Sequence, residues 1–403
     1  MTTQRSNPPI WMMGLTDITF GMVMTFSVTT VPQILAEQGV SGGHIAAITA
    51  VILSPGWWAF LFAPMLDVRF RRQTYALVLG FLAALGAAFI AFDHHNLLAI
   101  EIAAFTCILA VSLYQGAVGG WMGSLIEKEQ DGLLSSWFIG GGIAAGGIMA
   151  MAGEPVILHC PPILAAALIF VVITLPMAFF LFIPAPQPDK LLAAESFGRF
   201  WREVLSLFKR SEVLIGMVLF VLPSASFALT NVLAGIGKDY QASSTMVSSL
   251  AGAGYVIAGI AGLLLVPRLA KKLPLRPLYL GIGVVGALFT LSTLLLPRSP
   301  FALAVVFTGE ILFQTLAFAV ATGIMFEIIG RDNPLAATTF TLLTSVMFVP
   351  TSYMAFVDGW GYDKGGLIGS FAVDAGFGIA ACLLLAIMLR RWLFAPRLEA
   401  EPV

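Results

Sequence analysis

The stretch LFAPMLDVRFRRQTYALVLG, residues 61–80, joins the end of one apolar segment to the start of the next through a short basic turn. Three arginines, Arg69, Arg71 and Arg72, lie within four positions of this turn. Short loops that stay in the cytoplasm hold an excess of Lys and Arg, because their translocation across a bilayer is unfavourable. The turn is therefore predicted to lie on the cytoplasmic side of a membrane.

The same alternation of apolar segments and basic turns continues along the whole chain. Eighteen of the 21 Lys and Arg residues fall in the terminal stretches or in every second gap between about a dozen apolar segments. The other gaps contain only Lys238, Arg298 and Lys364. This pattern predicts an even number of spans with both termini in the cytoplasm.

The composition excludes an ordinary soluble domain. The chain is 59% hydrophobic and 11% charged, with a mean hydropathy of +0.93, whereas soluble domains have roughly 25% charged residues. We expect a bilayer as its surroundings and no nucleic-acid partner. The three cysteines share no metal-ligand spacing, so neither a metal nor a cofactor is predicted. The first apolar stretch has no cleavage pattern and is interpreted as a retained first span.

A hydrocarbon core of about 30 Å requires roughly 20 helical residues per span. The apolar runs between charge and turn clusters predict twelve transmembrane helices. Their expected ranges are 11–36, 43–66, 74–92, 97–126, 133–153, 161–184, 213–237, 244–267, 276–296, 300–329, 334–357 and 367–393.

The two halves of the chain resemble each other. Pro64 and Pro267 each precede a basic turn and are 203 residues apart, and Gln115 and Gln314 lie at similar depth in spans four and ten. The polar stretch 185–212 separates the halves, and its apolar residues recur at helical spacing, as in an amphipathic surface helix. We expect two pseudo-symmetric six-helix bundles, 1–184 and 213–403, joined by this linker, which is the arrangement of major facilitator transporters. A partner-binding role for the linker is the alternative.

No motif of a soluble enzyme is present: the chain has no P-loop, no H-E-x-x-H and no G-x-S-x-G. We therefore expect no catalytic residues. Ionisable residues inside spans are costly and usually functional. Asp17 lies about two turns into span one and Glu310 near the middle of span ten, and both are candidates for proton coupling. Glu101, Asp374 and Glu327 lie nearer the span ends, where a structural role is favoured.

Several prolines interrupt the predicted spans near mid-membrane, where broken hydrogen bonding is tolerated if the backbone faces protein or water. Polar side chains at similar depth are candidates for the lining of a solute cavity. These are Thr25, Gln115, Asn231, Gln314, Thr344 and Ser345.

Several short motifs resemble the peptide/acetyl-CoA transporter branch of the major facilitators, which includes AmpG-type muropeptide permeases and, more loosely, siderophore importers. They are LAEQGVS at 35–41, FAPMLD at 62–67, TTFTLLTS at 338–345 and DGW at 358–360. The chain departs from that branch at Ala59, where a lysine is expected, and at Gly116 and Gly119, where aspartates are expected. Of the functional positions of that branch, only those of Gln115, Asp67 and Pro64 are occupied by the same residue in this chain.

The resemblance implies that Asp67, Arg71 and Arg72 form a gate that holds the cytoplasmic side closed. The alternative is that the basic residues act only as an orientation signal. It also implies import of a small organic solute, muropeptide-like or siderophore-like, by alternating access with protons. The weakly charged centre favours a neutral, zwitterionic or metal-masked solute. An uncoupled facilitator or exporter, or a receptor that binds without flux, is the alternative. We expect a monomer in a bacterial inner membrane.

Overall fold

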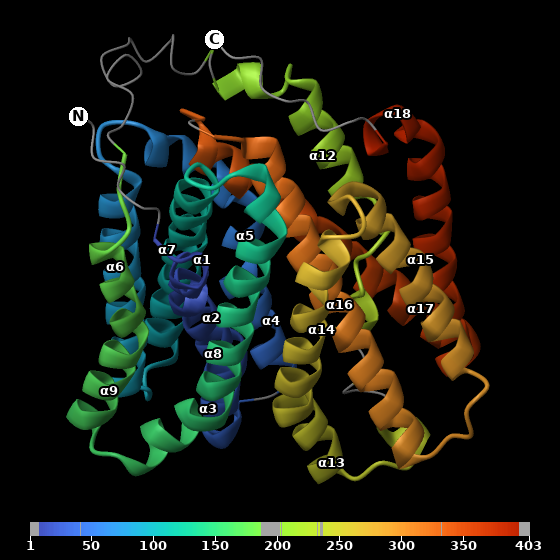
Figure 1. Cartoon of the computed structure of the whole chain (residues 1–403). Coiled ribbons are helices and arrows are strands. Elements are labelled where there is room, and N and C mark those ends of the chain that lie inside the picture. The colour runs from blue at the N-terminus through green and yellow to red at the C-terminus, as the bar shows by residue number, and fades with distance from the viewer. Residues whose placement is uncertain are drawn as a thin grey trace, which may run out of the picture.

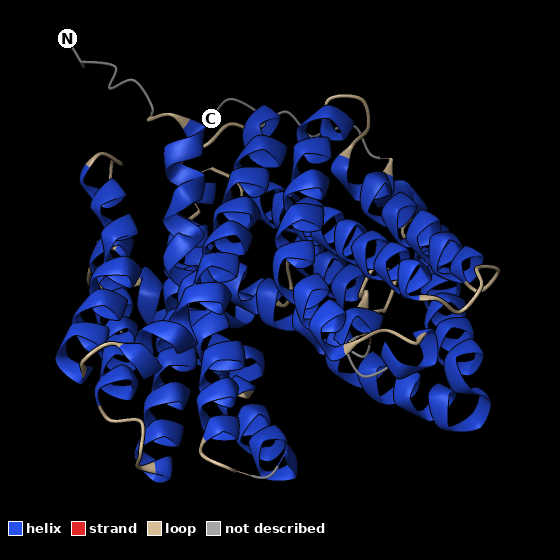
Figure 2. Ribbon diagram, turned by 90° about the horizontal axis from the view of Figure 1, so that it is seen from below, coloured by secondary structure: helices blue, strands red, loops and turns tan. Residues whose placement is uncertain are grey.

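The computed structural model describes residues 8–40, 42–186, 202, 204–231, 233, 237–331 and 333–394. All regular secondary structure in these ranges is helical, as Figure 2 shows. The helices of the first half lie on one side of the molecule and those of the second half on the other (Figure 1). The prediction of an all-helical membrane fold is confirmed.

The first two spans are interrupted helices. Span one consists of α1 (Ile10–Gly14), η1 (Leu15–Asp17), α2 (Ile18–Thr25), η2 (Phe26–Thr30) and α3 (Val31–Glu37). Span two consists of α4 (Gly42–Leu53), α5 (Pro55–Trp58), η3 (Ala59–Leu61) and η4 (Ala63–Asp67). Proline lacks the backbone N–H that a helix interior requires, so Pro55 begins α5 and Pro64 is the second residue of η4.

The remaining spans of the first half are more regular. They are α6 (Arg72–Phe92), α7 (Leu97–Gly123), α8 (Asp131–His159) and α9 (Pro162–Thr174). Two short segments accompany them, η5 (Lys128–Gln130) before α8 and η6 (Leu175–Leu181) after α9. Span five is six residues longer than its predicted end at 153, because α8 continues through Pro155.

The second half begins with α12 (Ser211–Val221), η7 (Ala228–Asn231) and η8 (Gly237–Tyr240). It continues with α13 (Ser244–Ser249), η9 (Leu250–Gly254), α14 (Tyr255–Ala270), α15 (Leu275–Thr293) and α16 (Pro300–Ile329). It ends with α17 (Ala336–Met388) and α18 (Arg390–Leu393). Helix α17 reverses at Gly365 and Gly366, whose backbone is not helical, and therefore contains two spans.

The predicted number of spans agrees with these elements. Nine described helices are long and apolar enough to cross a membrane, and α17 is one of them. The shorter apolar helices Ile48–Leu61 and Ser211–Val221 occupy the places of spans two and seven. Since α17 contains spans eleven and twelve, the described residues account for the twelve predicted spans.

Most of the predicted linker lies outside the described residues. Of 185–212, only 185, 186, 202 and 204–212 are described. Val204 and Leu207 are buried there and pack with Leu335, which precedes α17. The amphipathic helix of the linker stays a prediction.

Candidate functional site

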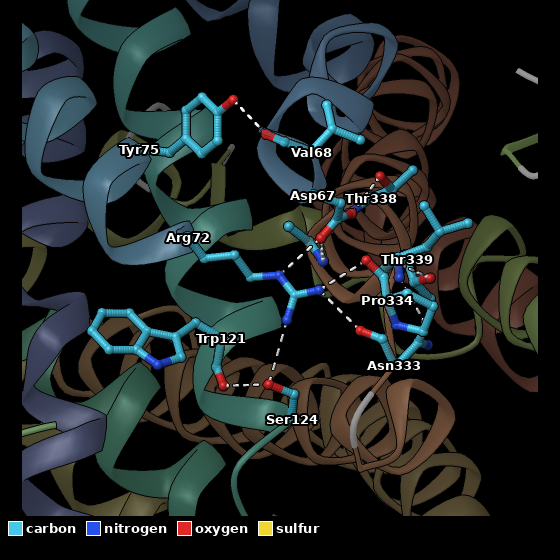
Figure 3. A network of polar contacts seen from close by, with 12 residues as sticks. Asp67, Val68, Arg72, Tyr75, Trp121, Ser124, Asn333, Pro334, Thr338 and Thr339 are labelled. Carbon is cyan, nitrogen blue, oxygen red and sulfur yellow. Dashed lines mark hydrogen bonds and ion pairs between the residues drawn. The ribbon is translucent and has the colours of Figure 1, made fainter. Parts of the chain in front are cut away.

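A polar contact between the two halves lies at the end of span two. Asp67, the last residue of η4, is only 3% exposed. Its carboxylate accepts hydrogen bonds from the backbone N–H of Ala337 at 3.1 Å and of Thr338 at 2.8 Å, and from the Thr338 hydroxyl at 2.7 Å (Figure 3). The first N–H groups of a helix have no intrahelical acceptor and carry partial positive charge. Asp67 therefore supplies from the first half the anionic N-terminal cap of α17 in the second.

Arg72, the first residue of α6, holds this carboxylate in place. Its Nε donates to Asp67 Oδ1 at 2.8 Å, and its Nη2 donates to the carbonyls of Asn333 at 2.9 Å and Pro334 at 3.0 Å (Figure 3). Its Nη1 lies 3.5 Å from the Ser124 hydroxyl. The planar guanidinium thus bonds both to the first half and to the loop before α17. We call Asp67, Arg72, Asn333, Pro334 and Thr338 the latch.

Arg71 differs from its neighbour. Its side chain is exposed and makes none of the hydrogen bonds or ion pairs of the latch. The structure therefore brings together two of the three predicted gate residues, Asp67 and Arg72, and leaves Arg71 outside. The turn between Asp67 and Arg72 is stabilised by the Tyr75 hydroxyl, which donates to the Val68 carbonyl at 2.7 Å.

Beside the latch, α7 and α17 pack at very short range. A side chain at Gly120 would collide with the backbone of Ala337, one at Gly116 with the Thr341 side chain, and one at Gly119 with the Phe340 ring. Small residues let helix backbones approach closely in membranes. Gly116 and Gly119, the positions where the resemblance expects aspartates, thus lie in a helix contact between the two halves.

An aromatic cluster continues this contact. The ring of Phe138 on α8 lies 5.9 Å from that of Phe326 on α16 and 6.0 Å from that of Phe340 on α17. Phe326 and Phe340 stack at 5.7 Å. These apolar contacts and the latch together join the two halves at the end of the molecule that the basic turns predict to face the cytoplasm.

Asp17 lies where span one is interrupted. It ends η1, is 1% exposed, and accepts a hydrogen bond from Gln115 Nε2 on α7 at 3.4 Å. The Tyr114 hydroxyl donates to the Thr16 carbonyl at 2.6 Å, and Gly142 of α8 lies next to Asp17 Oδ2. Asp17 makes no ion pair with a described residue, so no basic side chain among those residues balances it when it is ionised.

Gln314 in the second half has a position equivalent to that of Gln115 in the first. Its Nε2 donates to the Thr230 hydroxyl at 2.8 Å and to the Phe227 carbonyl at 3.3 Å, where span seven is interrupted. Gln115 and Gln314 thus each bond to the broken helix of their own half. This equivalence agrees with the repeat that their sequence positions indicate.

Glu310 is buried inside the second half, with 0% exposure. One carboxylate oxygen accepts a hydrogen bond from the Thr290 hydroxyl on α15, and the other has no partner among the described residues. Asp17 and Glu310, the two candidates for proton coupling, are therefore in different halves, and the structure does not bring them together.

The other predicted cavity residues have varied surroundings. Thr25 lies against Gly146 of α8, the Thr344 hydroxyl lies 3.6 Å from the Met325 sulfur, and Ser345 is buried. Asn231 ends η7, and its side chain lies outside the described part of the structure.

Two buried side chains were missed as functional candidates by sequence reasoning. Asp358 is 0% exposed, and neither carboxylate oxygen has a partner among the described residues. The predicted end of span eleven at 357 placed Asp358 in a loop, but helical backbone continues through Lys364. Thr290, the partner of Glu310, was missed because a neutral hydroxyl residue close to Ser292 and Thr293 in an apolar helix gives no signal of its own.

Comparisons with known proteins agree with this geometry. A family model described as Major Facilitator Superfamily matches residues 13–325. The fucose:proton symporter FucP of E. coli superposes with a TM-score of 0.72 at 12% identity, covering 96% of this chain and 98% of that one. A bacterial homologue of the iron transporter ferroportin, in an outward-facing state, gives 0.67 at 14% identity, with coverages of 96% and 99%. The proton:xylose symporter XylE gives 0.66 at 16% identity, with 96% of each chain covered. The comparison with curated protein sequences returned no significant match.

Proposed function

The chain belongs to the Major Facilitator Superfamily, a family of membrane transporters, and on this premise we propose that it imports a small organic solute by proton-coupled alternating access. Residues 1–184 and 213–403 are the two moving bundles, and 185–212 is the linker between them. The protein is a monomer in a bacterial inner membrane, with both termini in the cytoplasm.

The latch is the observation that carries the proposal. Alternating access requires that contacts close one side of the membrane while the other side is open, and that these contacts can break. Asp67 and Arg72 bond across the bundle interface to one helix terminus and its preceding loop. Since these contacts join the two halves without a covalent link, relative rotation of the bundles would break them together.

Proton coupling is supported by the surroundings of Asp17 and Glu310. Each carboxyl group is buried and bonded to one neutral side chain, Gln115 or Thr290. A buried carboxylate without a cation is costly, so it holds a proton unless water or a cation reaches it. A bundle movement that changes the access of water to Asp17 would therefore bind and release a proton.

The proposed solute is neutral, zwitterionic or metal-masked, and its concrete class is muropeptide-like or siderophore-like. Ala59, Gly116 and Gly119 stand where the resembled transporters carry charges, so a polyanion such as an acyl-CoA would find few cationic partners. FucP and XylE, which share the fold, are named as proton symporters of fucose and xylose. These sugars are uncharged, which agrees with a weakly charged binding site.

A two-step experiment tests the proposal. A thermal-shift screen of the purified protein against muropeptides, siderophores with and without iron, sugars and acyl-CoAs identifies a ligand, since binding to the folded state raises stability. Proteoliposomes then measure uptake of that ligand with and without an inward proton gradient. We expect accumulation only with the gradient. Equilibration that is indifferent to the gradient would indicate a facilitator, and binding without flux would indicate a receptor.

A further inference from the structure

A small cavity lies in the second half, away from the latch. It has a volume of about 10 Å³, is partly open, and is lined by the broken part of span seven, by α15 and by the second span of α17. This volume suits one water molecule or one small ion. The oxygen-bearing side chains among its lining residues are Ser224, Ser226, Thr290 and Asp374.

The broken part of span seven gives this cavity backbone groups as well as hydroxyls. Helix α12 ends at Val221, Leu222 is extended, and the next helical turn begins at Ala228. Carbonyls in such a segment are not committed to helix hydrogen bonds, and in transporters unwound segments of this kind coordinate small cations. The Ser224 carbonyl accepts from the Cys382 thiol at 3.1 Å. The Ser224 hydroxyl is buried and has no partner of normal geometry among the described residues, with Tyr279 as its polar neighbour.

Three carboxyl groups lie in or near the cavity. Asp374 lines it, and Glu310 is bonded to Thr290, which lines it too. Asp358 lies within electrostatic range of both Asp374 and Glu310. None of the three carboxyl groups makes an ion pair with a described residue, and three of their oxygens, Glu310 Oε2 and both of Asp358, are buried without a partner. Buried carboxylates are stable only when they are neutralised, so these groups require either protons or a bound cation.

The lining chemistry selects the kind of cation. All its side-chain donors are oxygens, which favours a hard cation over a transition metal. Only one carboxylate, Asp374, lines the cavity, so one positive charge is balanced there. The described residues contain no group of three or more His, Cys, Asp or Glu side chains arranged as a metal site, which disfavours a divalent ion. A proton binds to a single carboxylate oxygen and needs no cavity, whereas a metal ion needs space and several oxygen ligands.

We propose that the cavity between residues 222–227, Thr290 and Asp374 binds one sodium ion. The ion ties the broken part of span seven to spans nine and twelve, and it fixes one conformation of that segment. This site goes beyond the proposed function, because sodium binding requires neither the proposed solute nor a proton gradient. Failure of transport would leave the site untouched, and failure of sodium binding would leave proton-coupled import untouched.

The test uses the full-length protein in lipid nanodiscs without any solute. Its thermal unfolding is followed while NaCl replaces N-methylglucamine chloride at constant ionic strength and neutral pH. We expect a saturable rise of about 2 °C once Na⁺ exceeds its dissociation constant about tenfold, and no such rise with K⁺. Equilibrium binding of radioactive Na⁺ to the same sample gives the stoichiometry, which should be one ion per chain.

Variants locate the site. Asp374→Asn keeps the shape of the side chain but removes its charge, and should abolish the Na⁺-dependent rise. Thr290→Val should weaken Na⁺ binding at least about tenfold, whereas Thr290→Ser, which keeps the hydroxyl, should retain it. Glu101→Gln, near the start of α7 in the first half, serves as the control and should respond to Na⁺ like the wild-type protein.

Three results would overturn the inference. The first is a wild-type protein that binds no radioactive Na⁺ and unfolds at the same temperature in Na⁺, K⁺ and N-methylglucamine. The second is a stability that depends on pH alone, which would mean that the carboxyl groups hold protons and the cavity holds water. The third is undiminished Na⁺ binding in a folded Asp374→Asn protein.

Discussion

At the scale of single residues, Asp67 is the side chain whose loss should most affect the closed state of the latch. Asp67→Asn removes the charge that faces Arg72 and the α17 terminus, while the change in shape is small. The Asp67–Arg72 ion pair lies within the first half, so only the hydrogen bonds from Asp67 to the α17 terminus are lost when the interface opens. Hydrogen bonds to a charged group contribute about 1.5–3 kcal/mol, so Asp67→Asn should destabilise the closed state relative to the open one by about 2 kcal/mol.

A reporter on the bundle interface measures this change. Ser135 is buried on α8 and lies against Gly323 of α16, so a Ser135→Cys substitution in a background without the native cysteines becomes accessible when the interface opens. Maleimide labelling should accelerate at least about tenfold in Asp67→Asn. Glu127→Gln is the matched control, because its 3.9 Å ion pair with Arg331 is more than half exposed and such pairs contribute little. Unchanged labelling in Asp67→Asn would contradict a latch.

A second residue-scale prediction concerns Asp17. Asp17→Asn keeps an acceptor for Gln115 but can no longer bind and release a proton. Proton-driven accumulation of solute should fall at least about tenfold, while exchange of labelled for unlabelled solute should persist. Both are measured in proteoliposomes, with Glu101→Gln as a control that should behave like the wild type. If Asp17→Asn accumulated solute normally, Asp17 would not be the coupling group.

Single residues also show why sequence reasoning found only part of the site. Asp67 and Arg72 could be predicted because a carboxylate beside a basic turn and a matching family motif are both local signals. Their partners at 333–338 could not, since a contact across about 270 residues has no local signature. Asp358 was missed for a different reason. Hydropathy ends span eleven at 357, seven residues before the end of its helical backbone at Lys364, and therefore places a buried carboxyl group in a loop.

At the scale of elements, the close contact between α7 and α17 depends on glycine at the crossing point. Gly120→Ala would place a methyl group against the Ala337 backbone, which cannot move without displacing α17. The substitution should lower the unfolding temperature and accelerate labelling at Ser135→Cys, as the latch variant does.

Gly281→Ala is the matched control for this prediction. Gly281 lies within α15, and a side chain there would meet no atom within 4 Å. Because alanine is about 0.5–1 kcal/mol better than glycine inside a helix, Gly281→Ala should unfold at an equal or higher temperature. Equal behaviour of the two variants would show that the α7–α17 contact is not limited by space at Gly120.

The elements also show what hydropathy can and cannot predict. Span ten was predicted with its observed limits, 300–329, because Pro300 and Gly330 bound an unbroken apolar run. Span seven was predicted as 213–237 but is α-helical only to Val221. Its apolar composition continues through the break, so hydropathy detects the crossing of the membrane and not the loss of helical hydrogen bonds. That loss forms the wall of the small cavity and carries the inference of an ion site.

At the scale of the whole molecule, the two halves repeat the same basic turn but use it differently. Arg72 and Arg276 are 204 residues apart, the same separation as Tyr75 and Tyr279. Arg72 bonds across the interface to the loop before α17. Arg276 instead pairs with Glu327 at 3.1 Å, lies 3.4 Å from Glu212, and stacks 4.0 Å above the Trp392 ring, all within the second half. One copy therefore joins the bundles, and the other stabilises a single bundle.

This asymmetry predicts opposite phenotypes for two equivalent substitutions. Arg276→Ala leaves Glu327 buried without its partner, so the unfolding temperature should fall while labelling at Ser135→Cys stays slow. Arg72→Ala should accelerate labelling at least about tenfold with a smaller change in unfolding temperature, because it alters the balance between two folded states. Both variants are measured in the same lipid nanodiscs. If both variants accelerated labelling equally, Arg276 would contribute to closure of the interface as Arg72 does, and the predicted asymmetry between the two arginines would be wrong.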